Sequence, residues 1–154
     1  LKPMKIWIKR LLTIGAVGAI VGVGIVIYLF NMPHRDVVGE EASIKVAATE
    51  LVANFLDNEA TANQKYLDNV VEISGTVQSV RTDSQGQAVI MLKEAGQKAA
   101  VSCTFTSETS KDVEGITEGS SITIKGIVRA GSTYDADMDL YEHVVVEKCS
   151  LVKQ

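Results

Sequence analysis

The chain has 154 residues, a formal net charge of −4 and only two cysteines. This length suits one small domain with a single core, and two cysteines exclude a disulfide-rich scaffold. After residue 30 the sequence contains eleven Lys and Arg against nineteen Asp and Glu, a net charge of −8. Such an acidic region argues against nucleic-acid binding, because that binding depends on Lys and Arg contacts with phosphate.

The first element is an uncharged apolar segment over residues 11–30, LLTIGAVGAIVGVGIVIYLF. Twenty residues rising about 1.5 Å each give a helix of about 30 Å, the thickness of the hydrocarbon core of a bilayer. The segment therefore predicts a transmembrane helix that acts as a signal anchor. A cleaved signal peptide is the alternative, but its apolar core is usually shorter, and the ending YLFNMP offers no small-residue cleavage site.

Basic residues before this helix predict its orientation. Residues 1–10 contain four of them, namely Lys2, Lys5, Lys9 and Arg10, whereas Arg35 alone stands close behind the helix. Excess positive charge stays on the cytoplasmic side of a membrane. We therefore expect residues 1–10 in the cytoplasm and the rest of the chain, after the helix, outside it, in a periplasm or at the cell surface.

Glycines within the apolar segment suggest a second role for it. Gly18 and Gly22 have the G-x-x-x-G spacing that lets two membrane helices approach closely. Glycine is also simply common in such helices. A homodimer through this face is thus a hypothesis.

Residues 31–42 contain a proline, a glycine and several charges, and they predict a short tether. Over 43–57 the apolar residues recur at the spacing of one helical face: Ile44, Ala47, Ala48, Leu51, Val52, Phe55 and Leu56. We expect this amphipathic helix to pack on the domain rather than on a membrane, because its polar face is mainly acidic. Asn58 can cap a second, shorter helix over 59–67.

From Val70 onward the apolar period changes from 3.6 to 2, which predicts strands. Five segments show it, at 70–80, 87–93, 98–105, 120–129 and 140–152. A longer connection separates the first three strands from the last two, and Gly75 and Gly126 lie in mid-strand, where glycine allows a strand to coil. The pattern favours a mainly β domain with N-terminal helices, built as a small closed barrel over residues 43–154.

The run NEATANQKYLDNVVEISGTVQSV, followed by VSCTF, EGSSITIKGIV and VVVEKCSLV, resembles the tRNA_anti-like group of bacterial OB-fold domains. Members of this group are often small membrane-anchored or exported proteins. The resemblance covers about residues 45–152 and implies a five-stranded OB barrel preceded by helices. It implies no chemistry, since it supplies no catalytic motif.

The connection between the fourth and fifth strands is a candidate ligand-facing loop, as in other OB barrels. It holds Tyr134, Asp135, Asp137 and Asp139. The D-x-D-x-D spacing is that of a calcium loop, but Leu140 and Val146 stand where such a loop needs glycine and a bidentate glutamate. We therefore expect a solvated acidic loop and no metal site.

Catalytic and cofactor sites are not predicted. His34 and His143 are far apart in sequence and lack cysteine or carboxylate partners at ligand spacing. No nucleophile-elbow, phosphate-loop or zinc-protease motif is present. The sequence therefore favours a protein that is not an enzyme.

Cys103 and Cys149 fall on the third and fifth strands, which are neighbours in an OB barrel. An extracytoplasmic location would allow a disulfide between them to persist, and two reduced, buried thiols are the alternative. Alternation places Cys149 on one face with Val145 and Leu151. The inward face of this strand stays ambiguous, because its other face is also apolar.

These observations predict a single-pass membrane protein of the bacterial cell envelope whose extracytoplasmic OB-fold domain acts as a binding or assembly module. Its partner would be a protein, a peptide or a glycan. Nucleic-acid binding is the alternative, by analogy with the fold alone, and the charge of −8 disfavours it.

Overall fold

The computed structural model describes residues 2–31 and 37–153. The chain divides into two compact units, Leu1–Arg35 and Asp36–Gln154. The first unit is the helix α1, Lys2–Phe30. Its segment Ile8–Phe30 has a mean hydropathy of 2.4 and no buried residue, so it is long and apolar enough to cross a membrane. A signal sequence near the N-terminus has the same properties.

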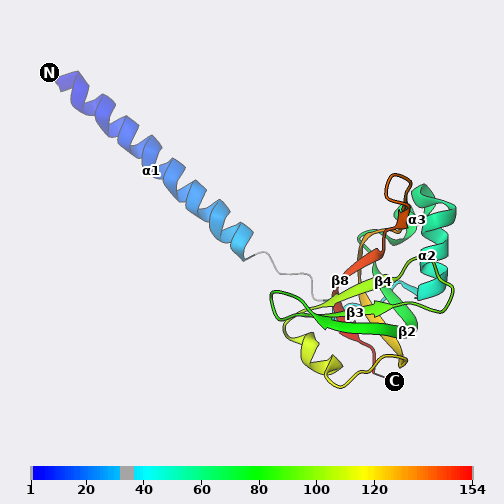
Figure 1. Ribbon diagram of the computed structural model, residues 1–154. Helices are drawn as coiled ribbons and strands as arrows, with labels where there is room; N and C mark the ends of the chain where they lie inside the picture. Colours follow the sequence, from blue (N-terminus) through cyan, green and yellow to red (C-terminus); the bar gives the residue numbers. More distant parts are fainter. Residues whose placement is uncertain (1, 32–36, 154) are drawn as a thin grey trace. The chain divides into compact units, whose positions relative to one another are not determined.

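The second unit is a closed barrel of five strands (Figure 1). They are β2 (Val70–Thr82), β3 (Ala88–Leu92), β4 (Val101–Phe105), β5 (Ser121–Ala130) and β8 (Val144–Leu151). Neighbours follow the order β2-β3-β4-β8-β5, and β5 pairs with β2 to close the barrel. Only the β4–β8 pair among these is parallel. The predicted fold class, a five-stranded OB-like barrel with additional helices, is confirmed.

The long strand β2 takes part in two sides of the barrel. Its residues 70–76 pair with β5, and residues 77–82 pair with β3. Gly75 stands beside the change of partner, where a Cβ atom would lie 3.0 Å from the Cβ of Ala48. The mid-strand glycine therefore lets the helical segment pack closely against the coiled strand.

Two helices cover one end of the barrel: α2, Ala48–Asp57, and α3, Glu59–Tyr66. Phe55 and Tyr66 are buried, with ring centroids 5.8 Å apart. The Asn58 side chain accepts a hydrogen bond from the Thr61 N–H and caps α3, as its sequence position predicts. The connection between β4 and β5 contains a short 3₁₀ helix, η1 (Thr109–Val113).

The helix predicted over 43–57 begins only at Ala48. Residues Ile44–Ala47 instead form strand β1, parallel to β2, with Ile44 opposite Val71. Ile44 and Ala47 fit a helical face, but long-range pairing with β2 decides their structure. The helix prediction was therefore wrong for these four residues.

The predicted tether also differs from the structure. Val37 is buried and packs with Val70 and Ile127 on the outer side of β2 and β5. The Lys125 ammonium donates hydrogen bonds of 2.9 Å to the backbone oxygens of Val38 and Glu40. Residues 37–43, which we call the strap, are thus part of the folded unit. Residues 32–36 of the predicted tether lie outside the described residues.

The inward face of β8 changes along the strand. Val144, Val146 and Cys149 are all buried, although two are even-numbered and one is odd-numbered. The switch occurs at Lys148, whose φ of 52° places it in the left-handed region, and the pairing register with β4 shifts there. Cys149 therefore shares the core with Val144 and Val146, and Leu151 packs against the same core, so the predicted common face was wrong for Val145 only.

Candidate functional site

The connection between β5 and β8 is an ordered hairpin that projects from the barrel (Figure 1). Its strands are β6 (Tyr134–Asp135) and β7 (Leu140–Tyr141). We call residues 134–141 the hairpin. The sequence predicted a loop followed by one strand over 140–152, but that strand is interrupted at residues 142 and 143. The candidate residues Tyr134, Asp135, Asp137 and Asp139 all belong to the hairpin.

Hydrogen bonds and ring contacts fix the shape of the hairpin. Tyr134 and Tyr141 face each other across the two strands, with ring centroids 4.8 Å apart. The Tyr134 hydroxyl donates a 2.6 Å hydrogen bond to Asp139, and this bond raises the pKa of Tyr134 above its ordinary value. The Asp135 carboxylate accepts from the N–H groups of Asp137 and Met138, at 2.9 and 3.2 Å. Two of the candidate aspartates therefore act as turn-forming acceptors.

The root of the hairpin is held against the barrel. The buried Ser132 hydroxyl donates to the backbone oxygen of Glu142 at 2.7 Å, and the Glu142 N–H donates to the Thr133 oxygen at 2.8 Å. Gly131 packs on the ring of Phe55, where any Cβ atom would collide. A glycine at 131 is thus required for α2 and the root to approach each other.

Exposed apolar side chains concentrate on the hairpin. Tyr134, Met138 and Leu140 are 49%, 64% and 41% exposed. Among the described residues of the barrel unit, only Val38 and Val80 are other large apolar side chains with comparable exposure. Met138 and Leu140 were not among the predicted site residues, although large apolar residues within or beside an otherwise polar loop were a usable signal.

A metal site at the hairpin finds no support in the described part of the chain, where no group of three or more His, Cys, Asp or Glu is arranged to hold an ion. His143 lies at the end of the connection, and its Nδ1 accepts a hydrogen bond from the Ala100 N–H at 3.0 Å. Burial and the nearby Lys93 ammonium lower the pKa of His143. The imidazole is therefore mainly neutral at pH 7. His34 lies outside the described residues.

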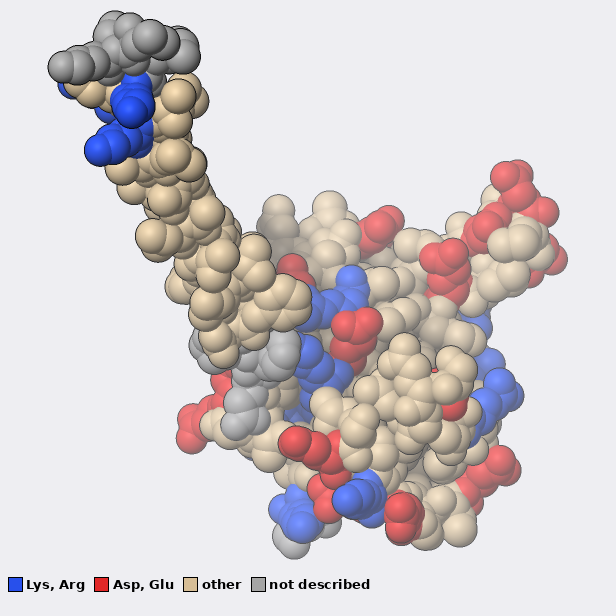
Figure 2. Space-filling model, turned by 90° about the vertical axis from the view of Figure 1, so that its left-hand side faces the viewer, with Lys and Arg blue, Asp and Glu red and all other residues tan. Residues whose placement is uncertain are grey.

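Basic side chains do not gather into one stripe on the face of the molecule that Figure 2 shows, where blue and red side chains are intermixed. Arg129 pairs with Asp68 at 2.6 Å and with Glu147 at 3.4 Å. Lys45 lies 3.7 Å from Glu72. Lys98 stands over the Tyr141 ring, 5.3 Å from its centroid. Arg129, Lys45 and Lys98 thus each have an anionic or aromatic neighbour, which leaves less of their positive charge for a phosphate backbone.

The two cysteines are buried free thiols in the structure. They point into the core from adjacent strands, although the residue paired with Cys149 is Phe105 rather than Cys103. Burial, and secondly the neighbouring Cys103 thiol, raise the pKa of Cys149 well above its ordinary value. A disulfide between them in the exported protein stays a prediction.

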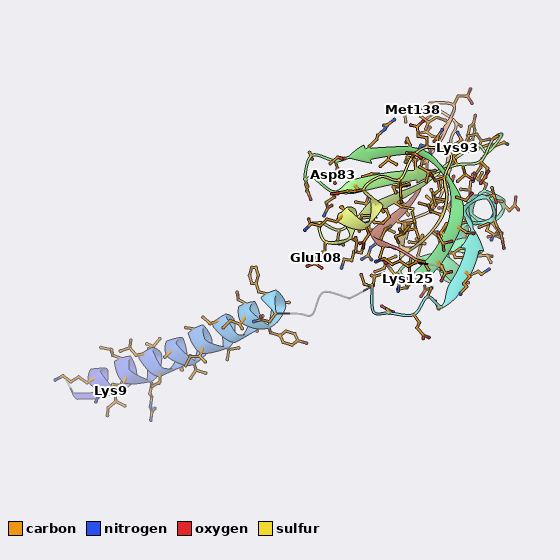
Figure 3. All side chains as sticks on the ribbon, turned by 90° about the horizontal axis from the view of Figure 1, so that it is seen from below. Lys9, Asp83, Lys93, Glu108, Lys125 and Met138 are labelled. Atoms are coloured by element: carbon orange, nitrogen blue, oxygen red, sulfur yellow. The ribbon has the colours of Figure 1, made fainter. Side chains whose placement is uncertain are left out.

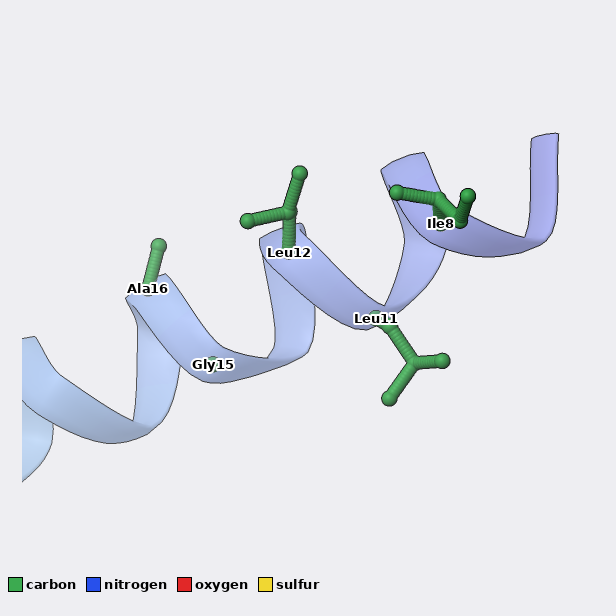
Figure 4. Close-up of a pocket in the computed structure, with 5 residues that line it drawn as sticks. All are labelled: Ile8, Leu11, Leu12, Gly15 and Ala16. Carbon is green, nitrogen blue, oxygen red and sulfur yellow. The ribbon is translucent and has the colours of Figure 1, made fainter. Parts of the chain in front are cut away.

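A shallow groove runs along one face of α1, between Ile8, Leu11, Leu12, Gly15 and Ala16 (Figure 4). These residues come from a single exposed helix, so the groove is a gap left by the small side chains rather than an enclosed cavity. A Cβ atom at Gly18 or Gly22 would meet nothing within 4 Å. Helix pairing through Gly18 and Gly22 stays a prediction.

A known structure with a TM-score above 0.5 supports the fold. A lipoprotein from Klebsiella pneumoniae subsp. pneumoniae, named as a candidate nucleic acid-binding protein, is 22% identical; the match covers 79% of this chain and 100% of that one, with a TM-score of 0.54. A candidate aspartyl-tRNA synthetase from Leishmania major is 14% identical over 80% of this chain but only 22% of its own, with a TM-score of 0.45.

No curated protein sequence matches the chain. A family model does match, over residues 4–139, and it is the one described as tRNA_anti-like. This range contains nearly all of α1, both covering helices, four of the five barrel strands and most of the hairpin. The chain therefore belongs to the tRNA_anti-like family.

Proposed function

We propose that the protein is a binding module of the bacterial cell envelope, anchored by α1 as a single membrane-spanning helix. The observation that carries the proposal is the segment Ile8–Phe30, 23 residues of high hydropathy with no buried residue. An apolar surface of this length is stable in a bilayer and costly in water. Lys5, Lys9 and Arg10 at its start support a cytoplasmic N-terminus and a barrel outside the cytoplasm.

Two further observations support this location and role. The Klebsiella protein of the same fold is named a lipoprotein, and lipoproteins are attached to membranes of the envelope. The barrel unit presents an ordered hairpin in the connection that OB folds use for ligands. Neither observation involves catalytic groups, and the proposed role is binding rather than catalysis.

The ligand that we propose is a protein, a peptide or a glycan. Nucleic acid is the second candidate, because the Klebsiella protein carries that name. Against it stand the charge of −8 after residue 30 and the ion pairs that occupy Arg129 and Lys45. Binding a polyanion gains free energy from counterions released when Lys and Arg neutralise phosphates, and after residue 30 the nineteen Asp and Glu outnumber the eleven Lys and Arg.

Reporter fusions at Gln154 of the full chain test the location. We expect activity from a reporter that works only outside the cytoplasm and none from a reporter restricted to the cytoplasm. As a matched control, Lys5→Glu, Lys9→Glu and Arg10→Glu together should lower the exported signal, because they remove the charge asymmetry. A reporter active only in the cytoplasm would overturn the proposal.

A titration of the detergent-solubilised full chain with labelled single-stranded DNA and RNA at low salt tests the ligand class. We expect no binding at micromolar concentrations. Micromolar binding that weakens steeply as the salt concentration rises would favour the second candidate instead.

A further inference from the structure

We propose that the hairpin is a docking surface for a protein partner that presents an apolar pocket rimmed by Lys and Arg side chains. This inference rests on the proposed function and deepens it by naming the class of partner and the surface that binds it. Three properties of the hairpin carry it: exposed apolar side chains, a fixed shape, and three carboxylates with no Lys or Arg within its own residues.

The apolar side chains come first. Met138 and Leu140 are 64% and 41% exposed, and the Tyr134 ring is 49% exposed. All three belong to one projecting element, where Tyr134 pairs with Tyr141 and Leu140 pairs with Asp135, so Tyr134 and Leu140 present apolar surface on opposite faces of the hairpin. Clustered apolar side chains on an exposed element are typical of interaction sites, because their burial can still stabilise a complex.

The fixed shape comes second. The Tyr134–Tyr141 ring contact, the Tyr134–Asp139 hydrogen bond and the two bonds to the Asp135 carboxylate all lie within the hairpin. Ser132 and Gly131 hold its root. A surface that is already ordered loses little conformational entropy on binding, so more of the burial energy appears as affinity.

The negative charge of the hairpin indicates the chemistry of its partner. Residues 131–143 contain four carboxylates, Asp135, Asp137, Asp139 and Glu142, and no Lys or Arg. Nucleic acids and anionic lipid surfaces would be repelled. A second copy of the chain is also disfavoured, because its own barrel unit is acidic. A protein surface with Lys and Arg around an apolar pocket complements both the charge and the apolar side chains.

The hairpin and the strap lie on different sides of the barrel unit. In Figure 3, Met138 lies at the outer margin of the barrel unit and Lys125, which holds the strap, lies on the opposite side. The strap therefore does not cover the hairpin.

Site-specific photocrosslinking in intact cells tests the proposal. A photoreactive amino acid replaces Met138 in the full chain, and the matched control replaces Val80, an exposed apolar residue outside the hairpin. We expect one predominant protein adduct from position 138 and at least fivefold less from position 80. Mass spectrometry of the adduct should map the partner's crosslinked peptide to a segment with net positive charge.

Charge reversal tests the basic rim. Asp137→Lys in the position-138 variant should lower the adduct at least fivefold, whereas Glu118→Lys, on an exposed turn before β5, should leave it unchanged. Equal circular dichroism spectra of the variants would establish that the fold is intact. Equal losses from both substitutions would overturn the role of the hairpin charge.

The proposal is overturned if position 138 gives no protein adduct, or if its adducts are lipid, glycan or a second copy of the chain. A protein adduct from position 80 but not from 138 leaves the envelope module in place and removes the hairpin as its docking surface. A cytoplasmic reporter signal at Gln154 overturns the proposed function, whatever the crosslinks show.

Discussion

The β5–β8 wall of the barrel and the hairpin that joins these two strands use apolar side chains in opposite ways. In the wall, Val128, Val144 and Val146 are completely buried. In the hairpin, Met138 and Leu140 are exposed although hydrogen bonds also hold the backbone around them. Burial of the apolar side chains in the wall stabilises the fold, whereas the exposed apolar side chains of the hairpin can still be buried by a partner. Substitutions in the two regions should therefore have different consequences.

The largest loss of stability is expected from Phe55→Ala. Phe55 is buried between Tyr66 and Gly131, and truncation of a buried phenylalanine leaves a cavity that costs about 3 to 5 kcal/mol of unfolding free energy. Urea denaturation of the full chain in detergent, followed by circular dichroism, measures it. Phe30→Ala in α1 is the matched control, with no effect on barrel unfolding expected. A loss below about 1 kcal/mol would show that Phe55 is not part of the core.

The next largest effect on stability is expected from the predicted Cys103–Cys149 disulfide. It would close a loop of about 45 residues, and the chain-entropy model gives about 4 kcal/mol for such a loop. We expect denatured, unreduced protein from the envelope to give no free-thiol label, and reduction to lower its stability. Two labels per chain would contradict the bond and leave the buried thiols seen in the structure.

Gly126→Ala should lower the free energy of unfolding by about 1 to 3 kcal/mol, because the added methyl group overpacks the core. A Cβ atom at this position in β5 would lie 2.6 Å from Val146 Cγ1 and 2.9 Å from Cys149 Sγ. Adding Cys149→Ala should make the double variant less destabilised than the sum of the two single variants, because the two sites share one space. Gly24→Ala, where a Cβ atom meets nothing within 4 Å, is the control. Full additivity would contradict the shared space.

The smallest effect is expected from Met138→Ser. An exposed side chain away from the core changes stability by no more than about 0.5 kcal/mol. Binding of the proposed protein partner should nevertheless weaken, unlike the effect of substitutions in the buried wall, which act on stability. A stability loss above about 1 kcal/mol would mean that Met138 supports the fold and is not free for a partner.

The strands of the barrel could be predicted because alternation follows directly from burial of one face. In β4 the alternating residues Val101, Cys103 and Phe105 are all buried. Simple alternation fails in β8, because the left-handed conformation of Lys148 switches the buried face of the strand. Both faces of this strand carry apolar residues, so its sequence does not indicate where the switch occurs.

Long-range contacts explain the other differences. Strand β1 forms because Ile44 and Val46 pair with β2. Its apolar residues also fit the helical spacing that continues into α2, so the sequence pattern predicted a helix there. The strap is ordered by Val37 and by Lys125, far away in sequence. At the candidate site the sequence indicated the connection between β5 and β8 and its aspartates, and their role in binding stays a prediction. It did not reveal that Asp135 and Asp139 are occupied within the hairpin, because those bonds depend on its three-dimensional shape.

The position of β8 in the sheet has a consequence for synthesis of the chain. This strand pairs with β4 on one side and β5 on the other, so the barrel cannot close until residues 144–151 have left the ribosome. Until then β4 and β5 each present an unpaired edge, which is a template for pairing with other chains. Because α1 precedes the barrel strands in the chain, it could insert into the membrane before β8 is made. The unpaired edges of β4 and β5 would then be kept away from soluble nascent chains. Loss of β8 alone should therefore cause aggregation rather than a smaller folded domain.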